Sequence, residues 1–207
     1  MKEDHYILTL NKDLVDVGFY YAALLPMSAS PSEDYGSYAW YAGPDRWEQQ
    51  IPEINVPLKL SMKKNYSYDV RGGSWYFYVI SDKFLSAISD LKTSFKQIIP
   101  IECVEVNKRK LSGEKLYAAV PRKFFEKEVL VSGGGILKID PNFDYDLFDV
   151  KDVDIHIATL ICTEKARAAL IAAGISTISF IPISQVKYPN PIKSYDALNS
   201  CNDYMPV

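Results

Sequence analysis

The sequence predicts an α+β fold with a mixed or antiparallel sheet and few helices. Apolar runs rich in β-branched and aromatic residues recur along the chain, and one longer stretch occurs twice. Residues 79–104 and 161–186 align without a gap, the second copy 82 positions after the first. Two copies are too few for a solenoid, which needs about three or more repeats. We therefore interpret them as a pseudo-duplicated strand–helix–strand unit, near 75–107 and 154–187.

Each copy contains the signals that begin a helix. Ser81 and Thr163 are hydroxyl residues that can N-cap, and the acids that follow them favour the positive helix end. Apolar residues then recur at helical spacing in both copies. Gly174 follows the second period and is expected as a C-cap, because glycine adopts positive φ at little cost.

Strands are expected on both sides of each helix. The runs 75–80 and 155–161 are β-branched and aromatic. Pro100 and Pro182 occupy matched positions after the helices, and proline cannot donate to a ladder, so each is expected at an edge, a bulge or a strand end.

The rest of the chain contributes shorter signals. Strands are expected at 6–10, 116–120 and 136–139, the last after a tight turn at 132–135. Less regular stretches are 14–25 (strand or short helix), 51–60 (extended), 123–131 (short helix or irregular) and 140–154 (an acidic, aromatic loop). We expect a single domain over 1–187 and a C-terminal tail over 188–207.

Composition excludes several classes of protein. The 207 residues are 48% hydrophobic and 24% charged, as in ordinary globular proteins. A net charge of −3 disfavours bulk binding of nucleic acid or anionic membranes. The start of the chain resembles no signal peptide, and no apolar run approaches the length of a membrane helix, so we expect a cytoplasmic protein.

No catalytic or metal-binding signature stands out. Cys162 and His156 lie an even number of residues apart on an expected strand and so face the same side, but a packed cysteine and a satisfied histidine are the simpler interpretation. The glycines at 133–135 lack the Lys and Ser/Thr of a phosphate loop. The cysteines have no metal-ligand spacing. We expect no enzyme activity, no cofactor and no metal.

Two acidic and aromatic segments are candidate partner-binding surfaces. Aromatic side chains beside acids suit docking against a basic protein. The candidate residues are Asp144, Tyr145, Asp146, Phe148, Asp149 and Asp152 in one segment and Glu33, Asp34 and Tyr35 in the other. We expect that replacing Asp144, Asp146 and Asp149 together by Ala weakens partner binding without unfolding the protein.

The repeat also carries a resemblance to a known group of proteins. Thr163-Glu164-Lys165, an apolar helix, Ala173-Gly174 and a strand ending Phe180-Ile181-Pro182 resemble the C-terminal unit of α+β immunity proteins of bacterial polymorphic-toxin systems. The stretch from Ile80 to Val120 is similar to the upstream half of that group. The resemblance covers about residues 75–187.

The resemblance implies a cytoplasmic inhibitor that binds a cognate protein toxin, such as a basic nuclease, and protects the producing cell. Acidic charge would speed the encounter with a basic toxin. Two alternatives remain open: an effector-binding adaptor or chaperone, and, ranked last, a small hydrolase using Cys162 and His156. Oligomeric state does not follow from the sequence.

Overall fold

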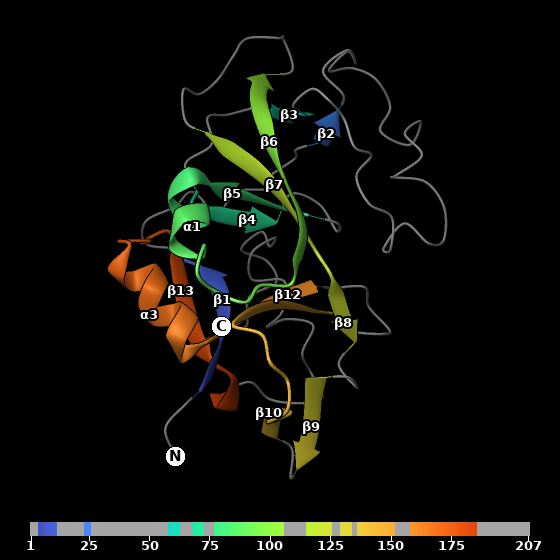
Figure 1. Cartoon of the computed structure of the whole chain (residues 1–207), viewed down its shortest axis with the longest axis vertical. Helices are drawn as coiled ribbons and strands as arrows, with labels where there is room; N and C mark the ends of the chain where they lie inside the picture. Colours follow the sequence, from blue (N-terminus) through green and yellow to red (C-terminus); the bar gives the residue numbers. More distant parts are fainter. Residues whose placement is uncertain are drawn as a thin grey trace.

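Over the residues that the structure describes, the protein is an α+β structure of two mixed sheets, a small hairpin and two short α-helices (Figure 1). The computed structural model describes residues 4–11, 23–25, 58–62, 68–72, 77–105, 115–125, 129–133, 136–151 and 158–185. The predicted fold class, with a mixed sheet and few helices, is confirmed. The predicted domain limits remain a prediction, and the tail at 188–207 lies outside the described residues.

One sheet has five strands in the order β13-β1-β12-β11-β8. Its neighbours are antiparallel except β11 and β8, which run parallel. The strands are β1 (His5–Leu10), β8 (Lys123–Phe125), β11 (Leu147–Lys151), β12 (Ala158–Thr163) and β13 (Ile178–Pro182).

The other sheet has six strands in the order β2-β3-β6-β7-β5-β4. Here β3 and β6 are parallel and the other neighbours antiparallel. The strands are β2 (Ala23–Leu25), β3 (Leu58–Met62), β4 (Val70–Gly72), β5 (Tyr78–Ser81), β6 (Phe95–Glu105) and β7 (Leu116–Pro121). The sheets meet where Thr93 bridges Leu147 and the Arg122 N–H donates to the Ser94 carbonyl at 2.7 Å.

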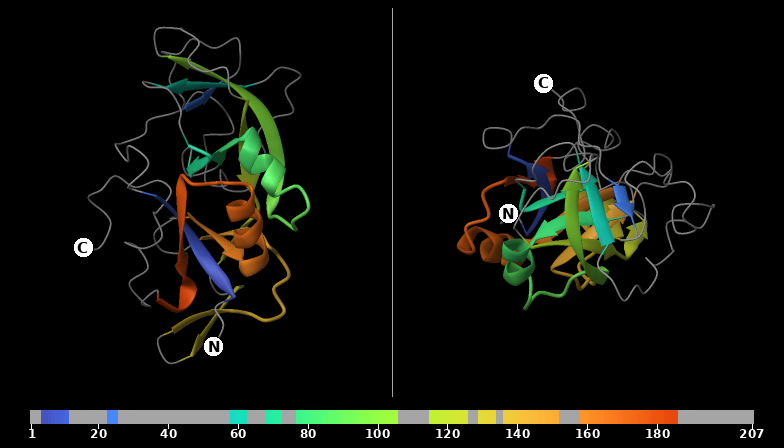
Figure 2. Two further views of the ribbon diagram at one scale, coloured as in Figure 1. Left: turned by 90° about the vertical axis from the view of Figure 1, so that its left-hand side faces the viewer. Right: turned by 90° about the horizontal axis from the view of Figure 1, so that it is seen from above.

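The hairpin β9 (Leu130–Gly133) and β10 (Ile136–Ile139) lies at the end of the molecule opposite β2 and β3 (Figure 1). The helices α1 (Asp82–Ala87) and α3 (Glu164–Ala172) lie side by side on one flank (Figure 2), and a single-turn helix η2 (Ile183–Gln185) follows β13. Among the described residues, no helix has the length and apolar character needed to span a bilayer.

Both helices begin as predicted. The Ser81 and Thr163 hydroxyls accept hydrogen bonds from the N–H groups of Phe84 and Ala166, at 3.1 and 3.3 Å. Each cap has extended backbone angles, as an N-cap requires. Gly174 follows α3 with φ +70°, so its predicted role as a C-cap is also confirmed.

The two repeat stretches adopt the same topology. In the first, β5 and β6 are both antiparallel to β7, which lies between them, so the α1 connection joins parallel strands. In the second, β12 and β13 both flank β1 in the same way and α3 makes the connection. The pseudo-duplication itself remains a prediction.

Matching aspartates tie each unit to the other. Asp69 precedes β4, and its carboxylate accepts hydrogen bonds from the Ser81 hydroxyl, at 3.1 Å, and from the Thr177 hydroxyl, at 3.0 Å. The Ser81 N–H also donates to the Asp69 carbonyl, at 2.8 Å. Asp69 therefore joins the start of α1 to the segment that follows α3.

Asp146 makes the reciprocal connection. It precedes β11, and its carboxylate accepts from the Thr163 hydroxyl, at 3.3 Å, and from the Lys92 N–H, at 3.0 Å. The Thr163 N–H donates to the Asp146 carbonyl, at 2.9 Å. Asp146 thus joins the start of α3 to the segment that follows α1, and we call the two aspartates with their partners the reciprocal clasps.

Among the described residues, two hydrophobic clusters stabilise this arrangement. The larger one lies between the sheets and helices and takes fully buried side chains from both repeat units, including Ile80, Phe84, Cys162 and Leu170. The smaller one lies on the other face of the five-stranded sheet, under the β9–β10 hairpin; it consists of Ile7, Phe124, Val129, Ile139, Phe148, Val150, Ile161 and Ile183. The five-stranded sheet is therefore buried on both faces.

Several predicted elements need correction. The segment 123–131, expected as a short helix or irregular, contains strands β8 and the start of β9. The segment 140–154, expected as a loop, contains β11, because Leu147, Phe148 and Val150 are all buried in the clusters. Predicted strands at 6–10, 116–120 and 136–139 are present. Pro182 ends the outer strand β13, and Pro100 lies in β6 ahead of its pairing with β3, as prolines in sheets must.

Removing either clasp carboxylate lowers stability. We expect Asp69→Ala and Asp146→Ala each to reduce the free energy of unfolding by about 1–3 kcal/mol. The first removes the acceptor of the part-buried Ser81 and Thr177 hydroxyls, and the second removes the charged acceptor shared by the Thr163 hydroxyl and the Lys92 N–H. Chemical denaturation of both variants measures this. The exposed Asp90 is the control, and Asp90→Ala is expected to change stability by less than about 0.5 kcal/mol. Clasp variants as stable as the control would contradict the assignment.

Candidate functional site

The candidate site is the loop Asp140–Asp146, which connects β10 to β11. Asp140 orders its beginning, because its carboxylate accepts from the Asn142 N–H at 2.8 Å and from the Asn142 side-chain amide at 3.0 Å. The Phe143 N–H donates to the Asp140 carbonyl at 2.9 Å and closes a turn. The first half of the loop is thus held by its own hydrogen bonds.

Aromatic side chains fix the middle of the loop to the smaller cluster. The Phe143 ring lies edge-on to Phe124 and Phe148, with centroids 4.8 and 4.7 Å away. The Tyr145 ring lies 5.2 Å from Phe124 and 5.4 Å from Phe143. Such geometries are favourable beyond the area they bury. Phe143 and Tyr145 both retain part of their surface, so they serve as anchor and as contact area.

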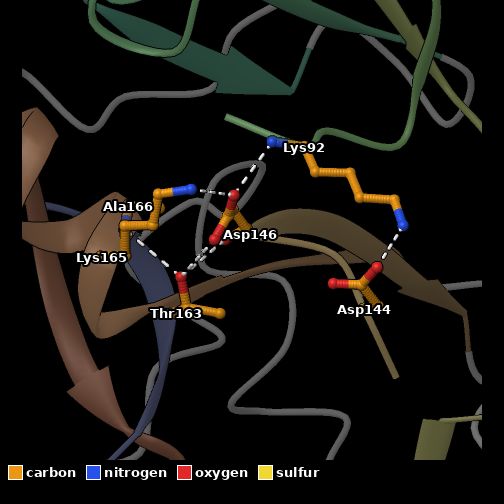
Figure 3. A network of polar contacts seen from close by, with 6 residues as sticks. All are labelled: Lys92, Asp144, Asp146, Thr163, Lys165 and Ala166. Carbon is orange, nitrogen blue, oxygen red and sulfur yellow. Dashed lines mark hydrogen bonds and ion pairs between the residues drawn. The ribbon is translucent and has the colours of Figure 1, made fainter. Parts of the chain in front are cut away.

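Asp146 closes the loop in a polar network (Figure 3). In addition to its clasp contacts, its carboxylate accepts from the Lys165 ammonium at 2.9 Å, and the Asp146 N–H donates to the Lys92 carbonyl at 2.7 Å. Burial alone would raise the pKa of Asp146, but the hydrogen bonds from Lys165, Lys92 and Thr163 outweigh it and hold the pKa below its ordinary value. Asp146 is therefore a structural carboxylate.

Asp144 has the opposite character. Its side chain is 87% exposed, and it pairs with the Lys92 ammonium at 2.5 Å. The same ammonium lies 5.1 Å from the centre of the Tyr145 ring. The hydrogen bond that the Lys92 ammonium donates to Asp144 raises the pKa of Lys92. Asp144, Tyr145 and Lys92 thus form an exposed group beside the structural network of Asp146, and we call these three residues the loop surface.

The structure divides the predicted partner-binding residues into three sets. Asp144, Tyr145 and Asp146 lie together in the loop, and their role in binding remains a prediction. Phe148 and Asp149 are fully buried in β11, so the expectation that they lie in an exposed loop is corrected. The others lie outside the described residues: Asp152, Glu33, Asp34 and Tyr35.

Asp149 instead takes part in a buried polar contact between the sheets. The Tyr78 hydroxyl, from β5, donates to the Asp149 carboxylate at 2.9 Å. The Asp149 N–H donates to the Ser94 hydroxyl at 3.3 Å. A buried carboxylate is costly unless it is hydrogen-bonded, so these contacts support the junction rather than a binding surface.

Cys162 is unsuited to nucleophilic catalysis in this fold. Its side chain is fully buried in the larger cluster. Burial raises the pKa of the Cys162 thiol far above its ordinary value, and the Arg167 charge offsets this only in part. His156, its suggested partner, lies outside the described residues. Within the part of the chain that the structure describes, no three His, Cys, Asp or Glu side chains converge as a metal site.

Two residues of the reciprocal clasps were missed in the sequence. Lys92 follows the first helix in an unremarkable polar segment, and Asp69 lies alone before β4. Neither matches a motif. Asp69 and Asp146 lie 77 positions apart, whereas Ser81 and Thr163 lie 82 apart. An alignment of the two repeats without gaps therefore does not match the aspartates, and only an alignment that allows a gap could have done so.

No protein-family model matches the chain, and no curated protein matches it significantly.

Acid should release the Asp146 contribution to stability. Because the pKa of Asp146 is lower in the folded than in the unfolded chain, the contribution is complete above the unfolded pKa of about 3.9 and is lost as the pH falls through the folded pKa. We expect the stability difference between wild type and Asp146→Asn to be constant above about pH 5 and to shrink below about pH 4. Urea unfolding at several pH values measures it. An undiminished difference at pH 3 would contradict this role.

The thiol of Cys162 should be inert in the native protein. We expect iodoacetamide to leave the peptide containing Cys162 unmodified under native conditions and to alkylate it after denaturation, because the reactive species is an accessible thiolate. Mass spectrometry of the digested protein resolves this cysteine from the other two. Rapid native labelling of Cys162 would revive a catalytic role.

Proposed function

We propose that the protein is an immunity-type inhibitor that binds a cognate protein toxin in the cytoplasm of the cell that makes it. The observation that carries the proposal is the loop surface: an exposed carboxylate and a half-exposed tyrosine ring on a loop held by hydrogen bonds and aromatic packing. A preordered surface of this kind loses little conformational entropy on binding. Tyrosine is also among the residues that contribute most to interface energy.

The partner is proposed to be basic where it meets this loop. Asp144 is the most exposed of the three carboxylates in the loop. A negative charge at this position would attract a basic partner and raise the association rate. The resemblance of the repeat to immunity proteins of polymorphic-toxin systems supports the same function. The burial of Cys162 disfavours the hydrolase alternative, because the thiol is not accessible to a substrate.

The adaptor alternative differs in the consequence of binding. An adaptor or chaperone would bind an effector without neutralising it, and it would use the same kind of surface. Co-expression separates the two functions. Partners captured with the tagged full chain are expressed alone and then beside it.

A partner that kills when expressed alone and is harmless beside this protein supports the immunity function. A partner that is harmless alone supports the adaptor function. If the toxicity and the solubility of every captured partner are the same with and without this protein, both the immunity and the adaptor function are overturned.

The loop surface is tested by substitution. We expect Asp144→Asn combined with Tyr145→Ala to raise the Kd for the toxin at least about tenfold, since central aromatic and charged contacts often contribute more than about 1.4 kcal/mol. Calorimetry measures the Kd, and circular dichroism checks the fold. Asp146 and Asp149 are kept in this variant, because both carboxylates have structural roles. Replacing Asp144, Asp146 and Asp149 together by Ala would lower stability as well as binding, so that variant cannot test the interface. Unchanged affinity would remove the loop from the interface.

A further inference from the structure

Within the loop surface, a cation already lies against Asp144 and Tyr145. The Lys92 ammonium lies 2.5 Å from the Asp144 carboxylate and 5.1 Å from the centre of the Tyr145 ring. Figure 3 shows the Lys92 side chain extending away from Asp146 to reach Asp144. A carboxylate beside an aromatic face is a combination that favours an ammonium or guanidinium group. The chain therefore supplies its own example of what this pair of residues binds.

This internal contact is easily exchanged. The Lys92 and Asp144 side chains are 53% and 87% exposed, and ion pairs of such exposed groups contribute little to stability. The structural contacts of Lys92 use its backbone, because its N–H donates to the Asp146 carboxylate and its carbonyl accepts from the Asp146 N–H. The ammonium can thus leave Asp144 without opening the clasp.

We propose that Asp144 and Tyr145 form a subsite for an arginine side chain presented by a basic protein partner, and that the Lys92 ammonium is a built-in competitor which the arginine displaces. Arginine fits better than lysine, because its planar guanidinium can stack on the tyrosine ring and donate two parallel hydrogen bonds to the carboxylate. A guanidinium–ring contact already occurs next to the site, where the Arg122 guanidinium lies 4.9 Å from the centre of the Phe124 ring.

Identifying the partner as the toxin rests on the proposed function, but the subsite itself can be tested without a toxin. The probe is a tetra-arginine peptide titrated into the full-length protein, with the backbone amide resonances of Asp144 and Tyr145 followed by NMR. Three single variants are compared with wild type: Lys92→Gln, Asp144→Asn and Lys96→Gln. The last removes one positive charge from an exposed lysine on β6 and is the charge-matched control.

We expect saturable shifts at Asp144 and Tyr145 in the wild type, and binding about two- to five-fold tighter in Lys92→Gln, as the loss of one exposed ion pair implies. Asp144→Asn should abolish the shifts, Lys96→Gln should match the wild type, and tetra-lysine should bind more weakly than tetra-arginine.

Three results would overturn the proposal. Equal or weaker binding by Lys92→Gln means that the lysine is no competitor. If Lys96→Gln raises the affinity for tetra-arginine as much as Lys92→Gln does, the change in net charge alone explains the effect. Equal binding of both peptides removes the preference for arginine. Loss of toxin neutralisation or absence of a toxin, with the peptide results intact, would reject the proposed function and leave the subsite standing.

Discussion

The reciprocal clasps are the contacts on which the rest of the structure depends. Each aspartate lies just before a strand, binds the residue that caps the helix of its own unit, and reaches the segment that follows the helix of the other unit. Strand pairing holds each sheet together, and the Thr93–Leu147 bridge and the larger hydrophobic cluster bring the two units into contact. The clasps add direction to this contact, because each carboxylate accepts hydrogen bonds from both units at once, and hydrogen bonds to charged groups are stronger than neutral ones.

The Asp146 clasp holds the loop surface in a fixed position. Asp146 ends the loop and also joins Lys92 and Thr163, so the position of Asp144 and Tyr145 is set by contacts within both units. The aromatic packing of Phe143 on Phe124 and Phe148 fixes the other side of the loop. One residue, Lys92, serves both purposes: its backbone supports the clasp while its side chain covers Asp144. The separation of backbone and side-chain roles lets the surface change its occupant while the fold remains intact.

What the sequence predicted well was local. The caps at Ser81 and Thr163 and the C-cap at Gly174 depend on residues within one helical turn, so their signals are contiguous in the chain. The clasps join residues far apart: 108 positions separate Asp69 from Thr177, and 54 separate Asp146 from Lys92. No local pattern marks such a pair.

The acidic segment shows a second limit of pattern analysis. Its acids look equivalent in the sequence, but a strand begins at Leu147 and alternation then decides burial. Asp149 shares the face of Leu147 and is buried, whereas Asp144 precedes the strand and remains exposed. Both faces of β11 are covered, so the usual apolar–polar alternation of a half-exposed strand is missing, and the segment resembled a loop.

The clasps make the two units and the loop one cooperative structure. Native-state hydrogen exchange tests this at the amides of Asp69, Lys92, Phe143 and Asp146, whose N–H groups donate to the clasps or the loop. We expect all four amides to exchange near the rate of the central strand β12, and Asp69→Ala to accelerate exchange at Lys92 in the other clasp as well. If Phe143 and Asp146 exchange orders of magnitude faster than β12, or if Asp69→Ala leaves Lys92 unaffected, the units are independent and the loop is not preordered.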